Sequence, residues 1–203
     1  EVKGASCDKA EILAREFAAR TGRVFVSPYN DGDIVFGAGT VGLEIAADLA
    51  RFDDVLVPVG GGGLIAGIAG FVKAVRPAVR VVGVEPEVSA FMAASIAAGR
   101  LVEIDERETI ADAVAGGIEP GAITFPLCRD LVDAIETVPE RLIARGLARI
   151  EAAHGRVVEG AGALPVAALL QAPARWAGRI VVAVVSGANI APETFRAIVD
   201  SRP

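Results

Sequence analysis

The sequence has few of the residues that build disulfide scaffolds, metal clusters or nucleic-acid-binding surfaces. It contains two cysteines, one histidine and three lysines, and its net charge is −6 over 203 residues. Cys7 and Cys128 have no metal-ligand spacing, which disfavours a structural zinc site. The acidic balance disfavours a nucleic acid as partner, because such binding draws on clustered Lys and Arg. Aromatic residues make up only 5%, so Ala, Val, Ile and Leu must build the core.

Charge is missing from Val55 to Val72, a run long enough to suggest a membrane span. Pro58 and six glycines within the run argue against a membrane helix. We interpret it as a buried strand, a loop and a helix that packs against a sheet. Glu1 to Cys7 has no basic stretch followed by an apolar one, so we predict no secretory signal and a cytoplasmic protein.

Strands and helices are predicted to alternate along the chain. The strands are expected at 2–6, 23–27, 55–59, 80–85 and 180–185. The helices are expected at 8–20, 41–50, 64–76, 89–99, 139–153, 161–170 and 191–199. Residues 28–33 favour a turn, and the irregular stretch 100–125 favours a short helix between loops. This alternation predicts an α/β fold with an open, mostly parallel sheet and helices on both faces.

Four consecutive glycines, Gly60 to Gly63, lie between a predicted strand and a predicted helix. Without side chains, they let backbone N–H groups converge on one anion at the positive end of the helix. A phosphate is the expected anion. From the loop alone, two ligands stay open: a dinucleotide, with Glu85 at the end of the next strand, or a compact cofactor with one phosphate.

A second motif follows the apolar strand at 180–185, where Ser186 and Gly187 begin a turn. In open α/β sheets, ligands bind at the carboxyl ends of the strands. Ser186 is therefore expected beside the ligand of the glycine loop.

Together these motifs resemble the fold-type II pyridoxal-phosphate (PLP) enzymes of the threonine dehydratase and serine racemase family. The resemblance is carried, in the family's order, by residues 28–44, 59–67, 82–86, 109–112, 159–163 and 186–189. It implies a tryptophan synthase β-like fold. Residues 1–32 would then end the small substrate domain, and 33–203 would form the second half of the large PLP-binding domain.

The resemblance also implies roles for individual residues. The residues implied to hold the cofactor phosphate are Gly60, Gly61, Gly62, Gly63 and Leu64. Ser186 would face the pyridine nitrogen, where a hydroxyl can donate a hydrogen bond to the unprotonated ring. The implied reaction releases ammonia from a β-hydroxy amino acid such as threonine or serine and leaves a 2-oxo acid. A β-replacement synthase and a non-catalytic dinucleotide-binding module remain as alternatives.

Some positions depart from the family's pattern or refine it. Tyr29 stands where relatives have Phe or Asn, and Ala113 replaces a glycine, so both could reshape the substrate pocket. Glu159 and Gly187 are further candidates for the substrate pocket, and Glu159 is expected to orient the region of Ser186. Glu85 matches the glutamate of a divalent metal site in serine racemase-like members, but Phe91 replaces its aspartate, which disfavours a metal. Residues 117–128 are similar to the hydroxyectoine-utilisation dehydratase branch.

The family also requires a Schiff-base lysine in a Ser-x-Lys-x-Arg segment. The lysines here, Lys3, Lys9 and Lys73, lie in other contexts, and the family's Ser-Ser-Gly-Asn-His loop is absent from the sequence. We therefore expect the chain to be the C-terminal part of such an enzyme and to be inactive alone. Relatives are often dimers, so the resemblance also implies a homodimer.

Overall fold

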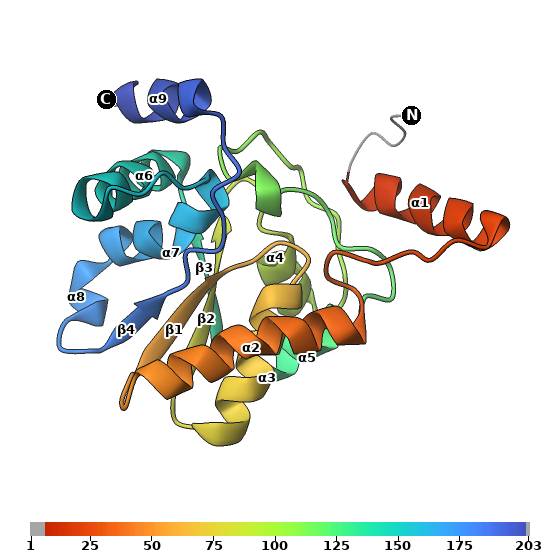
Figure 1. Cartoon of the computed structure of the whole chain (residues 1–203), viewed down its shortest axis with the longest axis horizontal. Helices are drawn as coiled ribbons and strands as arrows, with labels where there is room; N and C mark the ends of the chain where they lie inside the picture. The colour runs from red at the N-terminus through yellow and green to blue at the C-terminus, as the bar shows by residue number, and fades with distance from the viewer. Residues whose placement is uncertain (1–6, 202–203) are drawn as a thin grey trace.

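Four parallel strands form the centre of the chain, in the order β3-β2-β1-β4 (Figure 1). The computed structural model describes residues 7–201. The strands are β1 (Asp54–Pro58), β2 (Arg80–Pro86), β3 (Ala134–Val138) and β4 (Val181–Ala183). All three neighbouring pairs are parallel, so the predicted α/β class with an open parallel sheet is confirmed.

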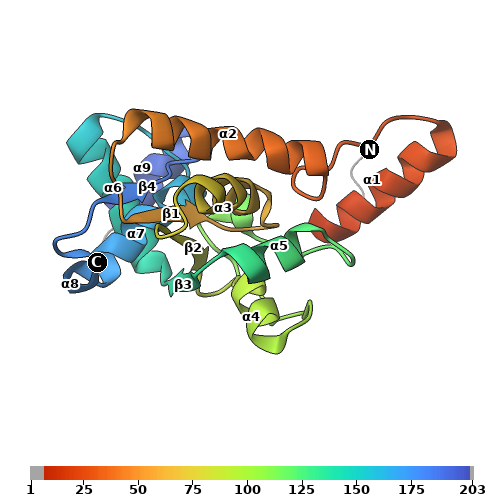
Figure 2. The ribbon, with the colours of Figure 1, turned by 90° about the horizontal axis from the view of Figure 1, so that it is seen from below.

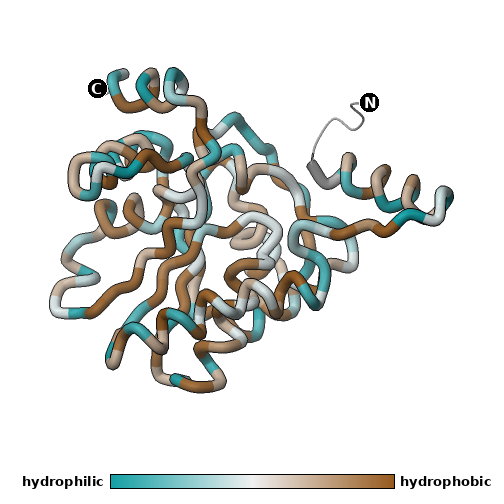
Figure 3. Tube along the Cα trace, in the orientation of Figure 1, coloured by the Kyte–Doolittle hydropathy of each residue, from teal (hydrophilic) through white to brown (hydrophobic). Residues whose placement is uncertain are grey.

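Each face of the sheet carries its own apolar cluster. β1 is buried along its whole length, and its side chains alternate between the two faces. Leu56 packs with helices from the last third of the chain, whereas Val55 and Val57 pack with the helix after the glycine loop. Burial on both faces explains why the strand is a continuous apolar run, visible as brown tube in Figure 3.

Helices cover both faces of the sheet (Figure 2). On one face lie α2 (Gly32–Asp48), α3 (Gly63–Val75), α4 (Phe91–Ala98) and α5 (Thr124–Leu131). On the other lie α6 (Glu140–His154), α7 (Gly160–Gln171), α8 (Pro173–Trp176) and α9 (Pro192–Asp200). A short 3₁₀ helix, η1 (Asp112–Val114), interrupts the loop between α4 and α5, as predicted for that stretch. α1 (Cys7–Thr21) stands apart from both layers in Figures 1 and 2.

Two helices on the same face, α2 and α3, approach each other at backbone distance. A Cβ placed on Gly67 would lie 2.3 Å from the Val35 carbonyl oxygen, and one on Gly39 would lie 3.2 Å from the Gly67 carbonyl oxygen. The absence of side chains at these positions therefore sets the spacing of the two helices.

The structure corrects several boundaries predicted from the sequence. α2 begins at Gly32, inside the predicted turn, because the Asp31 carboxylate caps it by accepting hydrogen bonds from the N–H groups of Asp33 and Ile34. Residues 23–27 do not form the predicted strand, since no described strand lies beside them. Val24 is 89% exposed there. β3 and α5 were not predicted, and the strand expected at 2–6 lies outside the described residues.

The uncharged run at 55–72 is β1, the glycine loop and most of α3, as interpreted from the sequence. Within residues 7–201, no helix is both long enough and apolar enough to cross a membrane.

Candidate cofactor site

The glycine loop and Ser186 lie at the same edge of the sheet. β1 and β4 are parallel neighbours, and the Val184 N–H donates to the Leu56 carbonyl at 3.0 Å, so their carboxyl ends meet. A cavity of about 270 Å³ opens there. Its lining includes all six residues predicted to bind the cofactor, Gly60 to Gly63, Leu64 and Ser186. Tyr29 and Ala113 also line it, with the loop at 114–117.

The amides at the start of α3 supply the hydrogen-bond donors of this cavity. The first helical bond runs from the Ala66 N–H to the Gly62 carbonyl, so the N–H groups of Gly63, Leu64 and Ile65 have no helical partner. Gly62 has φ +87° and places no side chain over them. These free donors and the positive end of the helix dipole suit a phosphate group. The residues present therefore fit the phosphate end of PLP.

The loop must be glycine because it is enclosed on three sides. A Cβ on Gly60 would lie 3.0 Å from the Val114 Cα, and one on Gly61 would lie 2.4 Å from the Tyr29 ring. A Cβ on Gly62 would lie 2.8 Å from the Met92 Cε. Any side chain here would collide with a neighbour, so the four glycines reflect close packing as well as access to a ligand.

Tyr29 covers the glycine loop and is itself fixed at its hydroxyl. The Tyr29 oxygen accepts a hydrogen bond of 2.9 Å from the Glu119 N–H. Burial, the largest influence, raises the pKa of Tyr29 well above its usual value, so the phenol stays neutral. Tyr29 can therefore shape the cavity and donate a hydrogen bond, but it is not a base at neutral pH.

Glu119 connects Arg15 and Asn30 by hydrogen bonds to its carboxylate, and it was not identified from the sequence. Its side chain is nearly buried, and its carboxylate accepts hydrogen bonds from the Asn30 amide at 2.5 Å and from Arg15 at 2.8 Å. The Asn30 side-chain oxygen in turn accepts from the Ile123 N–H at 2.8 Å. Partners so distant in the chain leave no local sequence signal.

Glu159 and Gly187 do not line the cavity but lie behind Ser186. The Glu159 N–H donates to the Gly187 carbonyl at 3.2 Å, and the Glu159 carboxylate accepts from the Asn189 N–H at 3.1 Å. A Cβ on Gly187 would overlap the Glu159 carboxylate. Glu159 thus contacts the turn that carries Ser186, whereas the sequence analysis placed Glu159 and Gly187 in the pocket itself.

Glu85 lies at the end of β2, outside the cavity lining. Both carboxylate oxygens are occupied, since Oε1 accepts from the Met92 N–H at 2.9 Å and Oε2 from the Ala93 N–H at 2.8 Å. Burial raises the pKa of Glu85 to about 7, against the opposing effect of these two hydrogen bonds. Across the described residues, no group of three or more His, Cys, Asp or Glu side chains could hold a metal ion.

Lys73, on the last turn of α3, lies at the opposite end of that helix from the glycine loop. Its ammonium pairs with Asp133 at 2.6 Å and donates to the Val79 carbonyl at 2.8 Å. These contacts hold Lys73 in a structural role.

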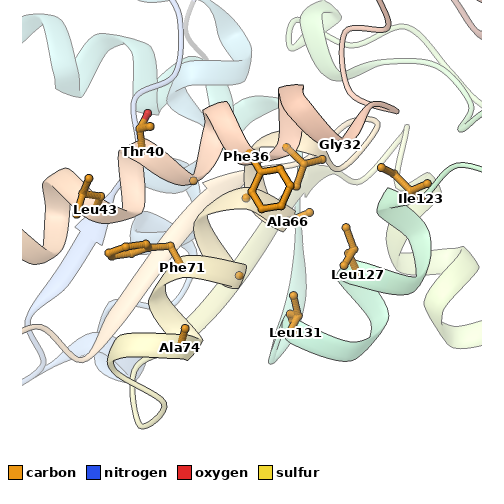
Figure 4. Close-up of a pocket in the computed structure, with 14 residues that line it drawn as sticks. Gly32, Phe36, Thr40, Leu43, Ala66, Phe71, Ala74, Ile123, Leu127 and Leu131 are labelled. Atoms are coloured by element: carbon orange, nitrogen blue, oxygen red, sulfur yellow. The ribbon is translucent and has the colours of Figure 1, made fainter.

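A second, larger cavity of about 630 Å³ lies between α2, α3 and α5 (Figure 4). Its walls are almost entirely apolar, with Phe36, Phe71 and Leu127 coming from the three helices. Phe36 is 81% exposed and Leu43 is 50% exposed. Such an apolar surface offers no donors for a phosphate and instead suits contact with another apolar surface.

Comparison with known proteins identifies the class. The family model described as "Pyridoxal-phosphate dependent enzyme" matches residues 1–187. The chain therefore belongs to this family of PLP-dependent enzymes. The predicted resemblance to the threonine dehydratase and serine racemase family is confirmed by individual relatives. Among them, the structure of maize serine racemase superposes with a TM-score of 0.84 at 32% identity, covering 95% of this chain and 61% of that chain.

The chain is 38% identical over 197 residues to the L-threonine ammonia-lyase of Geobacter sulfurreducens, covering 97% of this chain and 49% of that protein. It is 41% identical over 177 residues to the catabolic L-threonine dehydratase of Escherichia coli, covering 86% of this chain and 54% of that protein. The chain thus spans about half the length of the curated relatives it matches.

Solved structures confirm the tryptophan synthase β-like fold. Threonine deaminase isoform 2 of Solanum lycopersicum superposes with a TM-score of 0.89 at 30% identity, covering 98% of this chain and 59% of that chain.

Proposed function

We propose that this chain forms the phosphate-binding and pyridine-facing part of a PLP site in an ammonia-lyase. The substrate would be a β-hydroxy amino acid such as threonine or serine, and the products a 2-oxo acid and ammonia. One observation carries the proposal: the free amides at the start of α3 and the Ser186 hydroxyl share one cavity. The relatives named above act as threonine ammonia-lyases or dehydratases, which supports this substrate class.

PLP, when bound, supplies an electron-withdrawing ring that makes the substrate Cα–H acidic. The chain's own residues orient that ring. The N–H groups at Gly63 and Leu64 would bind its phosphate, and the Ser186 hydroxyl would donate a hydrogen bond to the pyridine nitrogen. Because the Ser186 side chain is neutral, it leaves the ring nitrogen unprotonated, which suits elimination of a β-hydroxyl. Tyr29 and the loop at 113–117 would limit access of water from the sides.

Ligand titration tests the cofactor assignment. We expect calorimetry to show saturable binding of PLP, weaker binding of pyridoxal, which lacks the phosphate, and no binding of NAD. Gly61→Ala should abolish PLP binding, because its Cβ meets the Tyr29 ring. Gly37→Ala is the matched control, since a Cβ there meets nothing within 4 Å. Binding of NAD without binding of PLP would instead identify a dinucleotide module.

The reaction itself is tested on the native protein that contains this sequence. We expect a 2-oxo acid to be released from threonine or serine in a PLP-dependent manner. Turnover that requires a second nucleophilic substrate, such as sulfide, would identify a β-replacement synthase and overturn the ammonia-lyase assignment.

We also propose that Glu85 caps α4 and binds no divalent metal. Both of its carboxylate oxygens are already engaged by backbone N–H groups, and buried Phe91 occupies the neighbouring position. Adding Mg²⁺ or Ca²⁺ should leave the thermal midpoint unchanged. A rise in the midpoint that Glu85→Gln removes would contradict this assignment.

A homodimer is proposed through the apolar cavity of Figure 4. In an isologous dimer the same patch of both subunits forms the interface, so that patch must carry both a protruding group and a hollow. Phe36, which lines the cavity and is largely exposed, supplies the protruding group. Light scattering should give a dimer mass for the wild type and a monomer mass for Phe36→Glu. Val157→Glu, at a half-exposed position outside the cavity lining, should remain dimeric. A monomeric wild type would overturn the proposal.

A further inference from the structure

One face of α5 lies directly under the glycine loop and contacts its carbonyl groups. The Thr124 hydroxyl donates a hydrogen bond of 2.6 Å to the Gly61 carbonyl oxygen. One helical turn later, the Cys128 thiol lies 3.7 Å from the Gly62 carbonyl oxygen and donates to it. Both side chains are fully buried, and neither lines the cavity. α5 therefore contacts the loop from the side away from the ligand.

These two contacts set the direction of the loop's amides. In a planar trans peptide, the C=O and the N–H of one unit point in opposite directions. The Gly61 carbonyl shares its peptide unit with the Gly62 N–H, and the Gly62 carbonyl shares its unit with the Gly63 N–H. Holding the Gly61 carbonyl against α5 therefore turns the Gly62 N–H away from α5, to the side where the loop lines the cavity. The Gly62 carbonyl also accepts the Ala66 N–H, so the Gly63 N–H is held by the first bond of α3 as well as by Cys128.

A run of glycines needs such an anchor more than other loops do. Glycine has the widest choice of backbone conformations, so the loop could rotate its peptide planes at little steric cost. Thr124 suits the role because its branched Cβ limits the χ1 rotamers that the hydroxyl can adopt, and the hydroxyl is already bonded to the Gly61 carbonyl. Burial raises the pKa of the Cys128 thiol to about 12, with the Glu85 charge as a second cause, so the thiol keeps its proton and stays a donor.

We propose that Thr124 is a positioning residue that orients the Gly62 amide toward the cofactor phosphate, and that Cys128 assists the first bond of α3 in holding the Gly63 amide. The proposal rests on the function proposed above and deepens it. Thr124 touches neither cofactor nor substrate, and it acts only through the peptide plane that its hydroxyl holds. Its effect should therefore depend on whether the ligand carries a phosphate.

The test compares Thr124→Val, which keeps the shape of the side chain but loses the hydroxyl, with Thr124→Ser, which keeps the hydroxyl. We expect Thr124→Val to weaken PLP binding by about tenfold and pyridoxal binding by less than twofold. Thr124→Ser should stay within threefold of the wild type. Thr40→Val is the matched control, because the Thr40 hydroxyl also donates to a glycine carbonyl, that of Gly37, at 2.7 Å but outside this cavity.

A purely structural role would lower the thermal midpoint and weaken PLP and pyridoxal to the same degree, and that result would overturn the proposal. So would unchanged PLP binding by folded Thr124→Val. If the valine variant does not fold, Thr124→Ala provides the same comparison. Cys128→Ala, which removes only the weaker donor, should change PLP binding by less than threefold.

Inorganic phosphate separates this proposal from the proposed function. In ¹⁵N-labelled protein, phosphate should shift the amide resonances of Gly62 and Gly63 in the wild type, and the Gly62 shift should be lost in Thr124→Val. Phosphate shifts that depend on Thr124, without any PLP binding, would keep the positioning role and reject the PLP assignment. PLP binding that does not depend on Thr124 would keep the PLP assignment and reject the positioning role. A wild type that binds neither ligand would reject both.

Discussion

The Glu85 carboxylate accepts a hydrogen bond of 2.9 Å from the Met92 N–H and thereby links the end of β2 to the first turn of α4. The carboxylate is buried, and burial raises its pKa from 4.5 to about 7 in the folded protein. Between these two values, the folded state holds a proton that the unfolded state has released. By linkage, the contribution of Glu85 to stability is fully present below about pH 4.5 and is lost as the pH rises through about 7.

We therefore expect Glu85 to make the free energy of unfolding pH-dependent. The free energy of unfolding of the wild type, taken relative to that of Glu85→Gln, should fall by roughly 3 kcal/mol between pH 5 and pH 8. The figure follows because a shift of one pKa unit corresponds to about 1.4 kcal/mol. Urea unfolding at several pH values measures this difference. Glu87→Gln, at an exposed neighbouring position, should keep the wild-type dependence. A difference between the wild type and Glu85→Gln that does not vary with pH would contradict the assignment.

The close contact of α2 and α3 predicts opposite effects for two glycines on one helix. Gly67→Ala should destabilise the protein by about 1–3 kcal/mol, because its Cβ would lie 2.3 Å from the Val35 carbonyl oxygen. Gly70→Ala should stabilise it by about 0.5–1 kcal/mol, because a Cβ there meets nothing within 4 Å and alanine favours the helix. Chemical unfolding measures both, and equal effects would show that the two helices do not pack as described.

Ser186 should affect the cofactor rather than the fold. Its side chain is exposed, so Ser186→Ala should change the free energy of unfolding by less than about 0.5 kcal/mol. Loss of one neutral hydrogen bond of about 0.5–1.5 kcal/mol should weaken PLP binding roughly two- to tenfold. Titration of PLP absorbance measures the change, with Ser201→Ala as the control on an exposed serine. Unaltered affinity would show that the hydroxyl does not meet the ring.

The fold's centre could be predicted from the sequence because its signals are local. The apolar run at 55–72 encodes strand, loop and helix within eighteen residues, and Ser186 follows an equally apolar strand. β3 was missed because its sequence, Ala134-Ile-Glu-Thr-Val138, has neither a dense apolar run nor clear alternation. Residues 23–27 show the opposite case. Their short apolar run, Val24 to Val26, suits a strand, but a strand also requires a partner.

The site was only partly predictable for a similar reason. Gly60 to Gly63 predict a phosphate-binding loop by residue type alone. The residues that hold this loop cannot be predicted in the same way, because their partners lie far away in the sequence. Thr124 and Gly61 are hydrogen-bonded across 63 positions, and Tyr29 and Glu119 across 90. Such contacts arise from the order of the strands and from helix packing, which sequence periodicity does not encode.

Glu159 supports the turn that carries Ser186, and its charge should matter to cofactor binding. Its carboxylate accepts from the Asn189 N–H at 3.1 Å, a charge-assisted bond that a neutral amide would weaken. We expect Glu159→Gln to weaken PLP binding by about threefold and to alter the absorbance of bound PLP. Glu159→Ala, which removes the acceptor, should weaken binding by roughly tenfold, equivalent to about 1.4 kcal/mol.

Titration of each variant with PLP and with pyridoxal identifies where Glu159 acts. Because Glu159 lies behind Ser186 and not under the glycine loop, both ligands should lose affinity equally, unlike the phosphate-selective loss expected for Thr124→Val. Glu193→Gln, on the exposed first turn of α9, is the control and should match the wild type. A Glu159→Gln variant with unchanged absorbance would show that the carboxylate does not orient Ser186.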